Sequence, residues 1–274
     1  IEAFFIRINS MQNIKLIVTD MDGTLLRSDH TLNPEFHKIY QQLKENDITF
    51  VPASGRQYYS IISYFESIKD ELAIIAENGT FVTYKGDEVF VDELDFSVVK
   101  EIIEEVRKID GANMVLAGKN AAYVESKDDV FIEYYKNYYA KNEWVDDLTK
   151  IKDEQFIKIA INHPKGTEEH VYKNVLAFEK YGLKVVVSGE VWLDIMNEKS
   201  NKGVALETLM NKLNISSEEI MVFGDFMNDL ETQKKFSQQE CIIHHDDFYK
   251  VNGPKSTDKK LLLQRSVTCM MLTA

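Results

Sequence analysis

Residues 14–25 read IKLIVTDMDGTL, an apolar run that passes abruptly into a polar cluster. The run at 14–19 predicts a buried strand, and Asp20 and Asp22 follow directly at its end. The elements expected next are a helix at 34–44, a strand at 48–51, a helix at 57–67 and a strand at 72–76. This alternation is typical of a parallel sheet with helices on its faces. In such sheets ligands bind beyond the carboxyl ends of the strands, where Asp20, Asp22 and Ser54 are expected.

The middle of the chain departs from this alternation after an expected hairpin at 80–84 and 88–91. A helix–strand–strand pattern then occurs twice, which indicates a small α/β insert. Its expected elements are helices at 97–109, 130–139 and 168–180 and strands at 114–117, 122–125, 156–162 and 184–187. A strand at 192–196, a helix at 202–213 and a strand at 220–224 are expected after it. We therefore predict an α/β protein with a parallel-sheet core at 11–84 and 188–274 and an α/β cap domain at 85–187.

Composition narrows the classes of partner. The chain has 274 residues, 44% of them hydrophobic, and a formal net charge of -13 at pH 7. Such a charge disfavours nucleic acid and anionic membranes, so neither is expected as a partner, and any phosphate site needs local positive charge. The two cysteines, Cys241 and Cys269, form neither a disulfide framework nor a CxxC pair, which fits a cytoplasmic location. Residues 1–10 are too short to span a bilayer and are interpreted as a leader before Met11, with a structural arm as the alternative.

Four polar clusters each follow an expected strand or open an expected helix. They lie at 20–25, 54–56, 202–203 and 224–229. Cleavage of a phosphate ester needs a nucleophile, an acid for the leaving group, cations for the phosphoryl oxygens and donors that hold the geometry. These clusters together contain residues suited to each task.

Asp20 is a reasonable nucleophile because carboxylates form aspartyl phosphates. A carboxylate about 4 Å from one phosphoryl charge is repelled by about 4 kcal/mol at an effective dielectric constant near 20. A bridging Mg²⁺ removes this barrier, and Asp20, Asp225 and Asp229 offer the oxygen ligands that it prefers. Asp22 is placed to protonate the leaving oxygen and later to activate water. Lys202 adds a fixed positive charge for the phosphate.

Residues 54–56 read SGR and are interpreted as a phosphate contact rather than only a helix N-cap. Ser54 offers a neutral donor, Gly55 lies between, and Arg56 offers a guanidinium for the same anion. We therefore place Ser54, Gly55 and Arg56 with Lys202 in the phosphate-binding set.

The sequences DMDGTLL, SGR, KG and GDFMND, in this order, resemble the haloacid dehalogenase superfamily of phosphatases, and the long insert resembles its Cof-like class IIB branch. The resemblance covers residue 14 to about residue 231 and implies a Rossmann-like core, a closing cap and Mg²⁺. By motif, Asp20 would be nucleophile and metal ligand, and Asp22 acid/base and metal ligand through its backbone carbonyl. Asp225 would bind metal with Asp229 in support, and Asn228 would lie close to the phosphate.

The chain after about residue 231 departs from the pattern of the family, and only residues 241–243 could serve as the next core strand. The leading hypothesis is hydrolysis of a small phosphorylated metabolite, such as a sugar phosphate or a phosphorylated cofactor. Phosphoryl transfer as in a phosphomutase, a receiver-like phosphate-binding module and a crippled protein are the alternatives. The sequence indicates no oligomeric state. Tyr134, Tyr135, Tyr138 and Tyr139 have helical spacing, which favours packing inside the cap over a stacking platform.

Overall fold

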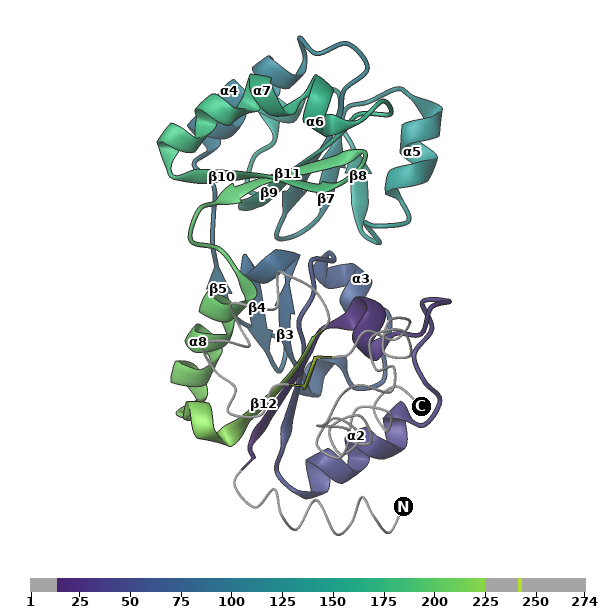
Figure 1. Cartoon of the computed structure of the whole chain (residues 1–274), viewed down its shortest axis with the longest axis vertical. Helices are drawn as coiled ribbons and strands as arrows, with labels where there is room; N and C mark the ends of the chain where they lie inside the picture. The colour runs from purple at the N-terminus through teal and green to yellow at the C-terminus, as the bar shows by residue number, and fades with distance from the viewer. Residues whose placement is uncertain (1–13, 225–240, 243–274) are drawn as a thin grey trace, which may run out of the picture.

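The computed structural model describes residues 14–224 and 241–242, and these residues form two lobes, one above the other in Figure 1. The lower lobe contains a parallel sheet in the order β13-β12-β1-β2. Its strands are β1 (Leu16–Thr19), β2 (Thr49–Pro52), β12 (Ile220–Gly224) and β13 (Cys241–Ile242). The predicted α/β fold with a parallel-sheet core is confirmed, and the expected strand beginning at residue 241 is β13.

A second, antiparallel sheet continues the lower lobe. It consists of β3 (Ala73–Ala76), β4 (Phe81–Tyr84) and β5 (Asp87–Val91). A parallel bridge between Ala53 and Ile75 joins it to the end of β2. Three helices flank these sheets: α2 (Phe36–Glu45), α3 (Tyr58–Ile62) and α8 (Lys202–Leu213). Helix α3 is shorter than the expected 57–67, because the chain tightens into turns that place Phe65 in the core.

The upper lobe is a six-stranded sheet in the order β10-β11-β9-β6-β7-β8. Its strands are β6 (Asn113–Gly118), β7 (Ala122–Val124), β8 (Asn142–Trp144), β9 (Phe156–Asn162), β10 (Leu183–Gly189) and β11 (Trp192–Asn197). Helices α4 (Phe96–Val106), α6 (Thr167–His170) and α7 (Tyr172–Val175) cover the face turned away from the lower lobe, while α5 (Asp129–Tyr135) lies at the β8 end (Figure 1). The expected helix at 168–180 is divided into α6, α7 and the 3-10 turns of η5 (Leu176–Tyr181). Strand β8 was not predicted.

Strand pairing favours crossings between the lobes after β5 and after β11, compared with the predicted boundaries at 84 and 188. Strand β5 pairs with β4, so the lower lobe continues to Val91. Strand β11 pairs with β9 and β10 and belongs to the upper sheet, so the chain returns only after Asn197. The crossings are tied together, because Asn197 Nδ2 donates to Asp92 Oδ1 at 2.7 Å and Ser200 Oγ also donates to Asp92. We propose the domain boundaries at 92–95 and 198–201.

No helix within residues 14–224 combines the length and the apolar character that crossing a bilayer requires.

Candidate active site

Asp20 and Lys202 meet at the carboxyl end of the parallel sheet. Asp20 follows β1, and its backbone N–H donates to the Phe223 carbonyl of β12 at 2.9 Å. Lys202 is the first residue of α8, and its Nζ lies 2.6 Å from Asp20 Oδ1. Both residues are buried, at 8% and 2% exposure. Residues 182 positions apart therefore form a charged pair at the site that the sequence predicted.

Gly79 lies directly against the start of α8. Gly79 has a φ of 96°, and a Cβ there would lie 2.4 Å from the Asn201 carbonyl oxygen. Asn201 caps α8, because its side chain accepts a hydrogen bond from the Val204 N–H at 2.8 Å. Only glycine permits this close approach of backbone to backbone. Gly79 thus helps to place Lys202 beside Asp20.

Asp22 forms a two-pronged pair with Arg56. Arg56 Nε donates to Asp22 Oδ2 at 2.7 Å and Arg56 Nη2 donates to Oδ1 at 2.5 Å. His30 Nδ1 lies 3.4 Å from the same carboxylate. Burial alone would raise the pKa of Asp22, but Arg56 and then His30 outweigh it and hold that pKa below its ordinary value. In this arrangement the Arg56 guanidinium donates to Asp22. The predicted contact of Arg56 with phosphate stays a prediction.

Ser54 and Gly55 follow β2 in the chain and lie against the turn that contains Asn78. Ser54 is buried, its N–H donates to the Ile75 carbonyl at 2.9 Å, and its Oγ accepts from the Arg56 N–H at 3.2 Å. A Cβ on Gly55 would lie 2.8 Å from Asn78 Oδ1. Since the Ala53 N–H bonds to the Thr19 carbonyl at 2.8 Å, this segment runs beside the end of β1. Ser54 therefore lies at the same edge of the sheet as Asp20.

A buried ion pair that the sequence analysis missed joins the two lobes. Glu77 follows β3 and is 0% exposed, and Lys158 of β9 is 4% exposed. Their charged groups are in direct contact, and Lys158 Nζ also lies 3.3 Å from the Gly55 carbonyl. Burial by itself would lower the pKa of Lys158, but the charges of Glu77, Tyr139 and Asp194 raise it above its ordinary value. No local sequence pattern indicates a role for Lys158, because it is the one charged residue in the otherwise largely apolar strand β9.

Asp225, Asn228 and Asp229 lie outside the described residues. The described strand β12 ends at Gly224, beside the end of β1 that carries Asp20. Within residues 14–224, no group of three or more His, Cys, Asp or Glu side chains gathers as a metal site. Mg²⁺ takes only one or two carboxylates together with water and phosphate oxygens, so a single buried carboxylate such as Asp20 fits it. The roles of all these site residues stay predictions.

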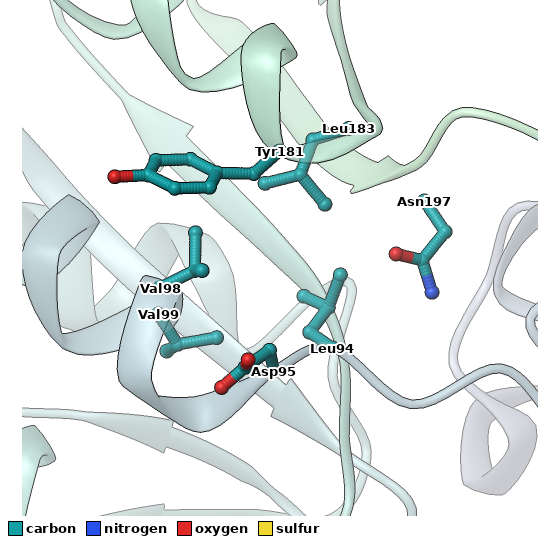
Figure 2. A pocket seen from close by; sticks show the side chains of 7 residues that line it. All are labelled: Leu94, Asp95, Val98, Val99, Tyr181, Leu183 and Asn197. Atoms are coloured by element: carbon teal, nitrogen blue, oxygen red, sulfur yellow. The ribbon is translucent and has the colours of Figure 1, made fainter.

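A pocket elsewhere shares no residue with this site. It lies between the start of α4 and the end of η5, and its lining residues include Leu94, Val98, Tyr181 and Asn197 (Figure 2). Its lining is of mixed polarity, and Asp95, its one carboxylate, caps α4 by accepting from the Ser97 N–H. This pocket has no arrangement suited to phosphate chemistry.

The family model and the similar relatives indicate the same family. Residues 17–236 match the model of the haloacid dehalogenase-like hydrolases. The chain is 36% identical over 223 residues to a 5-amino-6-(5-phospho-D-ribitylamino)uracil phosphatase of Escherichia coli, covering 80% of this chain and 81% of that protein. It is 28% identical over 228 residues to a phosphatase of the same name from Bacillus subtilis, covering 79% and 82%.

The fold agrees with that family. A solved sugar phosphatase of haloacid dehalogenase subclass IIB, BT4131, superposes with a TM-score of 0.65 at 17% identity, covering 79% of this chain and 82% of that one. This likeness shows a shared fold. The chain therefore belongs to the haloacid dehalogenase-like hydrolases and is a phosphatase of that superfamily.

Proposed function

We propose that this phosphatase hydrolyses a small phosphorylated metabolite in a magnesium-dependent reaction that passes through a phosphoryl group on Asp20. The observation that carries the proposal is the buried contact of Lys202 Nζ with Asp20 Oδ1 at the carboxyl end of the parallel sheet. The related enzymes from Escherichia coli and Bacillus subtilis are named for a phosphorylated ribitylaminouracil, which supports a small substrate of this class.

In the proposed first step, Asp20 attacks the phosphorus atom and the bond from phosphorus to the leaving oxygen breaks. Lys202 Nζ donates to Oδ1 of Asp20, which orients the carboxylate for attack on the phosphorus atom. Asp22 gives its proton to the leaving oxygen, so the alcohol departs neutral. Ser54 and Lys202 donate to the phosphoryl oxygens and hold their geometry.

In the second step, Asp22 takes a proton from a water molecule as that water attacks the phosphorus. Phosphate leaves, the Asp20 carboxylate is restored and Asp22 is again protonated. Asp20, the Asp22 carbonyl, Asp225 and Asp229 would hold Mg²⁺. When bound, the ion supplies positive charge that offsets the repulsion between the carboxylate and the phosphate.

The test of this proposal is release of inorganic phosphate from phosphorylated ribitylaminouracil and from sugar phosphates, without any acceptor other than water. We expect turnover with Mg²⁺, loss of turnover on chelation with EDTA and recovery when Mg²⁺ is restored. Phosphate release that is unaffected by EDTA would contradict the metal requirement. Phosphoryl transfer only to an added sugar would contradict hydrolysis.

Arg56 should set the pH range in which Asp22 works. Because Arg56 keeps the pKa of Asp22 below its ordinary value, the protonated acid is scarce at neutral pH. Arg56→Gln removes that charge and raises the pKa of Asp22, so the protonated fraction at a given pH increases. We expect the alkaline, descending limb of kcat/KM against pH to move to higher pH in Arg56→Gln.

The matched control for this prediction is Arg27→Gln, which removes an exposed guanidinium from the loop after η1 (Met21–Leu25). The Arg27→Gln profile should coincide with that of the wild type. A uniform fall in kcat/KM with an unmoved limb in Arg56→Gln would show instead that Arg56 acts on the phosphate and not through Asp22.

A further inference from the structure

The tyrosine stripe at 134–139 presents two different environments. Tyr135 and Tyr139 are 2% and 5% exposed and pack into the cap against Phe131 and the sheet, as the sequence favoured. Tyr134 and Tyr138 are 36% and 46% exposed and belong to no packed core. Cap packing therefore explains half of the stripe and leaves two large aromatic rings at the surface.

Trp192 completes a group with these two exposed tyrosines, which we call the aromatic platform: Tyr134, Tyr138 and Trp192. The rings of Tyr134 and Trp192 stack at 5.9 Å with 18° between their planes. Tyr138 meets both edge-on, at 5.4 Å from Tyr134 and 5.8 Å from Trp192. Trp192 Nε1 lies 3.4 Å from the Tyr134 hydroxyl, which lies 3.2 Å from the Tyr138 hydroxyl. These contacts hold the three rings in a fixed arrangement.

Tyr138 of the platform belongs to a segment that contacts α3, which begins just after Arg56. Ser60 Oγ of α3 donates to the Tyr138 carbonyl at 2.9 Å and accepts from the Ala140 N–H at 3.1 Å. Gln57 exchanges two hydrogen bonds with the backbone of Lys141, at 2.7 and 3.0 Å. These bonds anchor the segment after α5 to the residues that directly follow Arg56.

The charge of Arg56 also affects the Tyr138 phenol. Burial and the hydrogen bond with Tyr134 raise the pKa of the Tyr138 phenol, while the charge of Arg56 opposes that rise. Arg56 in turn binds Asp22, two residues from Asp20. The loop of Asp22 and the segment of Tyr138 thus both contact residues 56–60.

We propose that the aromatic platform binds a planar heterocycle at the far end of the substrate, so that the preferred substrate is a phosphate ester in which a flexible polyol chain carries such a ring. This inference rests on the proposed function and adds the class of leaving group to it. Exposed aromatic rings stack on planar rings with little dependence on sequence or substituents, and the tyrosine hydroxyls offer hydrogen bonds to ring oxygens and nitrogens. The pentitol chain between phosphate and uracil in the substrates that name the relatives supplies such a spacer.

The test compares two substrates that differ only in the ring. Phosphorylated ribitylaminouracil contains the heterocycle, and ribitol 5-phosphate has the same chain and phosphate without it. We expect Trp192→Leu and Tyr138→Leu to lower kcat/KM for the ring-containing substrate by about 5- to 100-fold, mainly through KM. We expect kcat/KM for ribitol 5-phosphate to stay within about twofold of the wild type. Tyr138→Phe should retain most of the preference because the ring remains.

The control is Tyr181→Leu, which removes another exposed ring, on the pocket of Figure 2 and hydrogen bonded to Glu101. Tyr181→Leu should leave kcat/KM unchanged for both substrates. Thermal melting of each variant checks that the cap remains folded. Equal losses for both substrates in Trp192→Leu, or no loss for either, would overturn the platform while leaving the phosphatase proposal in place. A wild-type protein that hydrolyses neither ester would count against the proposed function itself.

Discussion

Replacement of Asp20 by Asn is expected to reduce phosphate release by about 10⁴-fold or more at every substrate concentration. The amide keeps the size of the side chain but is a poor nucleophile and cannot form the acyl phosphate. It also removes the negative charge that faces Lys202 Nζ at 2.6 Å. The measurement is a steady-state assay of inorganic phosphate with the best substrate in Mg²⁺.

Asp29→Asn is the control for this change, because Asp29 is exposed and bonds only within its own loop, to Thr31 at 3.0 Å and 2.6 Å among the contacts described. Its activity should match the wild type. Thermal melting separates loss of chemistry from loss of fold, since Asp20→Asn removes the negative charge that the buried Lys202 ammonium contacts. A folded Asp20→Asn protein with more than about one tenth of the wild-type rate would contradict the role of Asp20.

Lys158→Met is expected to have the largest effect on stability, lowering the free energy of unfolding by about 3–5 kcal/mol. The substitution leaves the Glu77 carboxylate fully buried without its partner, and apart from Lys158 no described residue donates a hydrogen bond to either carboxylate oxygen. Because Glu77 lies in the lower lobe and Lys158 in the upper one, the loss should also weaken contact between the lobes. Urea unfolding followed by circular dichroism measures the change.

The double variant Glu77→Gln, Lys158→Met should regain most of the lost stability, since no uncompensated charge remains. Lys150→Met is the matched control: Lys150 pairs with Asp147 at 3.0 Å but its side chain is 80% exposed. An exposed pair contributes less than about 1 kcal/mol. If Lys158→Met and Lys150→Met had equal effects, the buried pair would not be what stabilises the contact between lobes.

Local sequence patterns predicted the central strands of the core, because the position of a strand in a parallel sheet shows in its composition. The apolar runs at 14–19 and 220–224 became the central parallel strands β1 and β12, because a buried parallel strand must be apolar on both faces. The run at 192–196 also became a strand, β11, but it pairs with β9 and not with the core. An apolar run specifies a strand without specifying its partners, so the run alone does not tell to which lobe it belongs.

The contacts within the candidate site are likewise only partly predictable from local sequence. Asp20 and Lys202 could be placed together because each marks the end of a strand or the start of a helix at one edge of the sheet. The pairing of Asp22 with Arg56 and of Glu77 with Lys158 depends on side-chain direction and on how the cap sits over the core. Such contacts between distant residues leave no periodic trace in the sequence. The tyrosine stripe shows this as well, because helical spacing alone does not tell buried Tyr135 from exposed Tyr138.

The most direct measurement is rapid acid quenching of the enzyme during turnover, followed by peptide mass spectrometry. The proposal predicts the added mass of one phosphoryl group on the peptide that contains Asp20, and its absence in Asp20→Asn. A phosphorylated peptide that lacks Asp20, or turnover without any phosphorylated peptide at times when product forms, would contradict it.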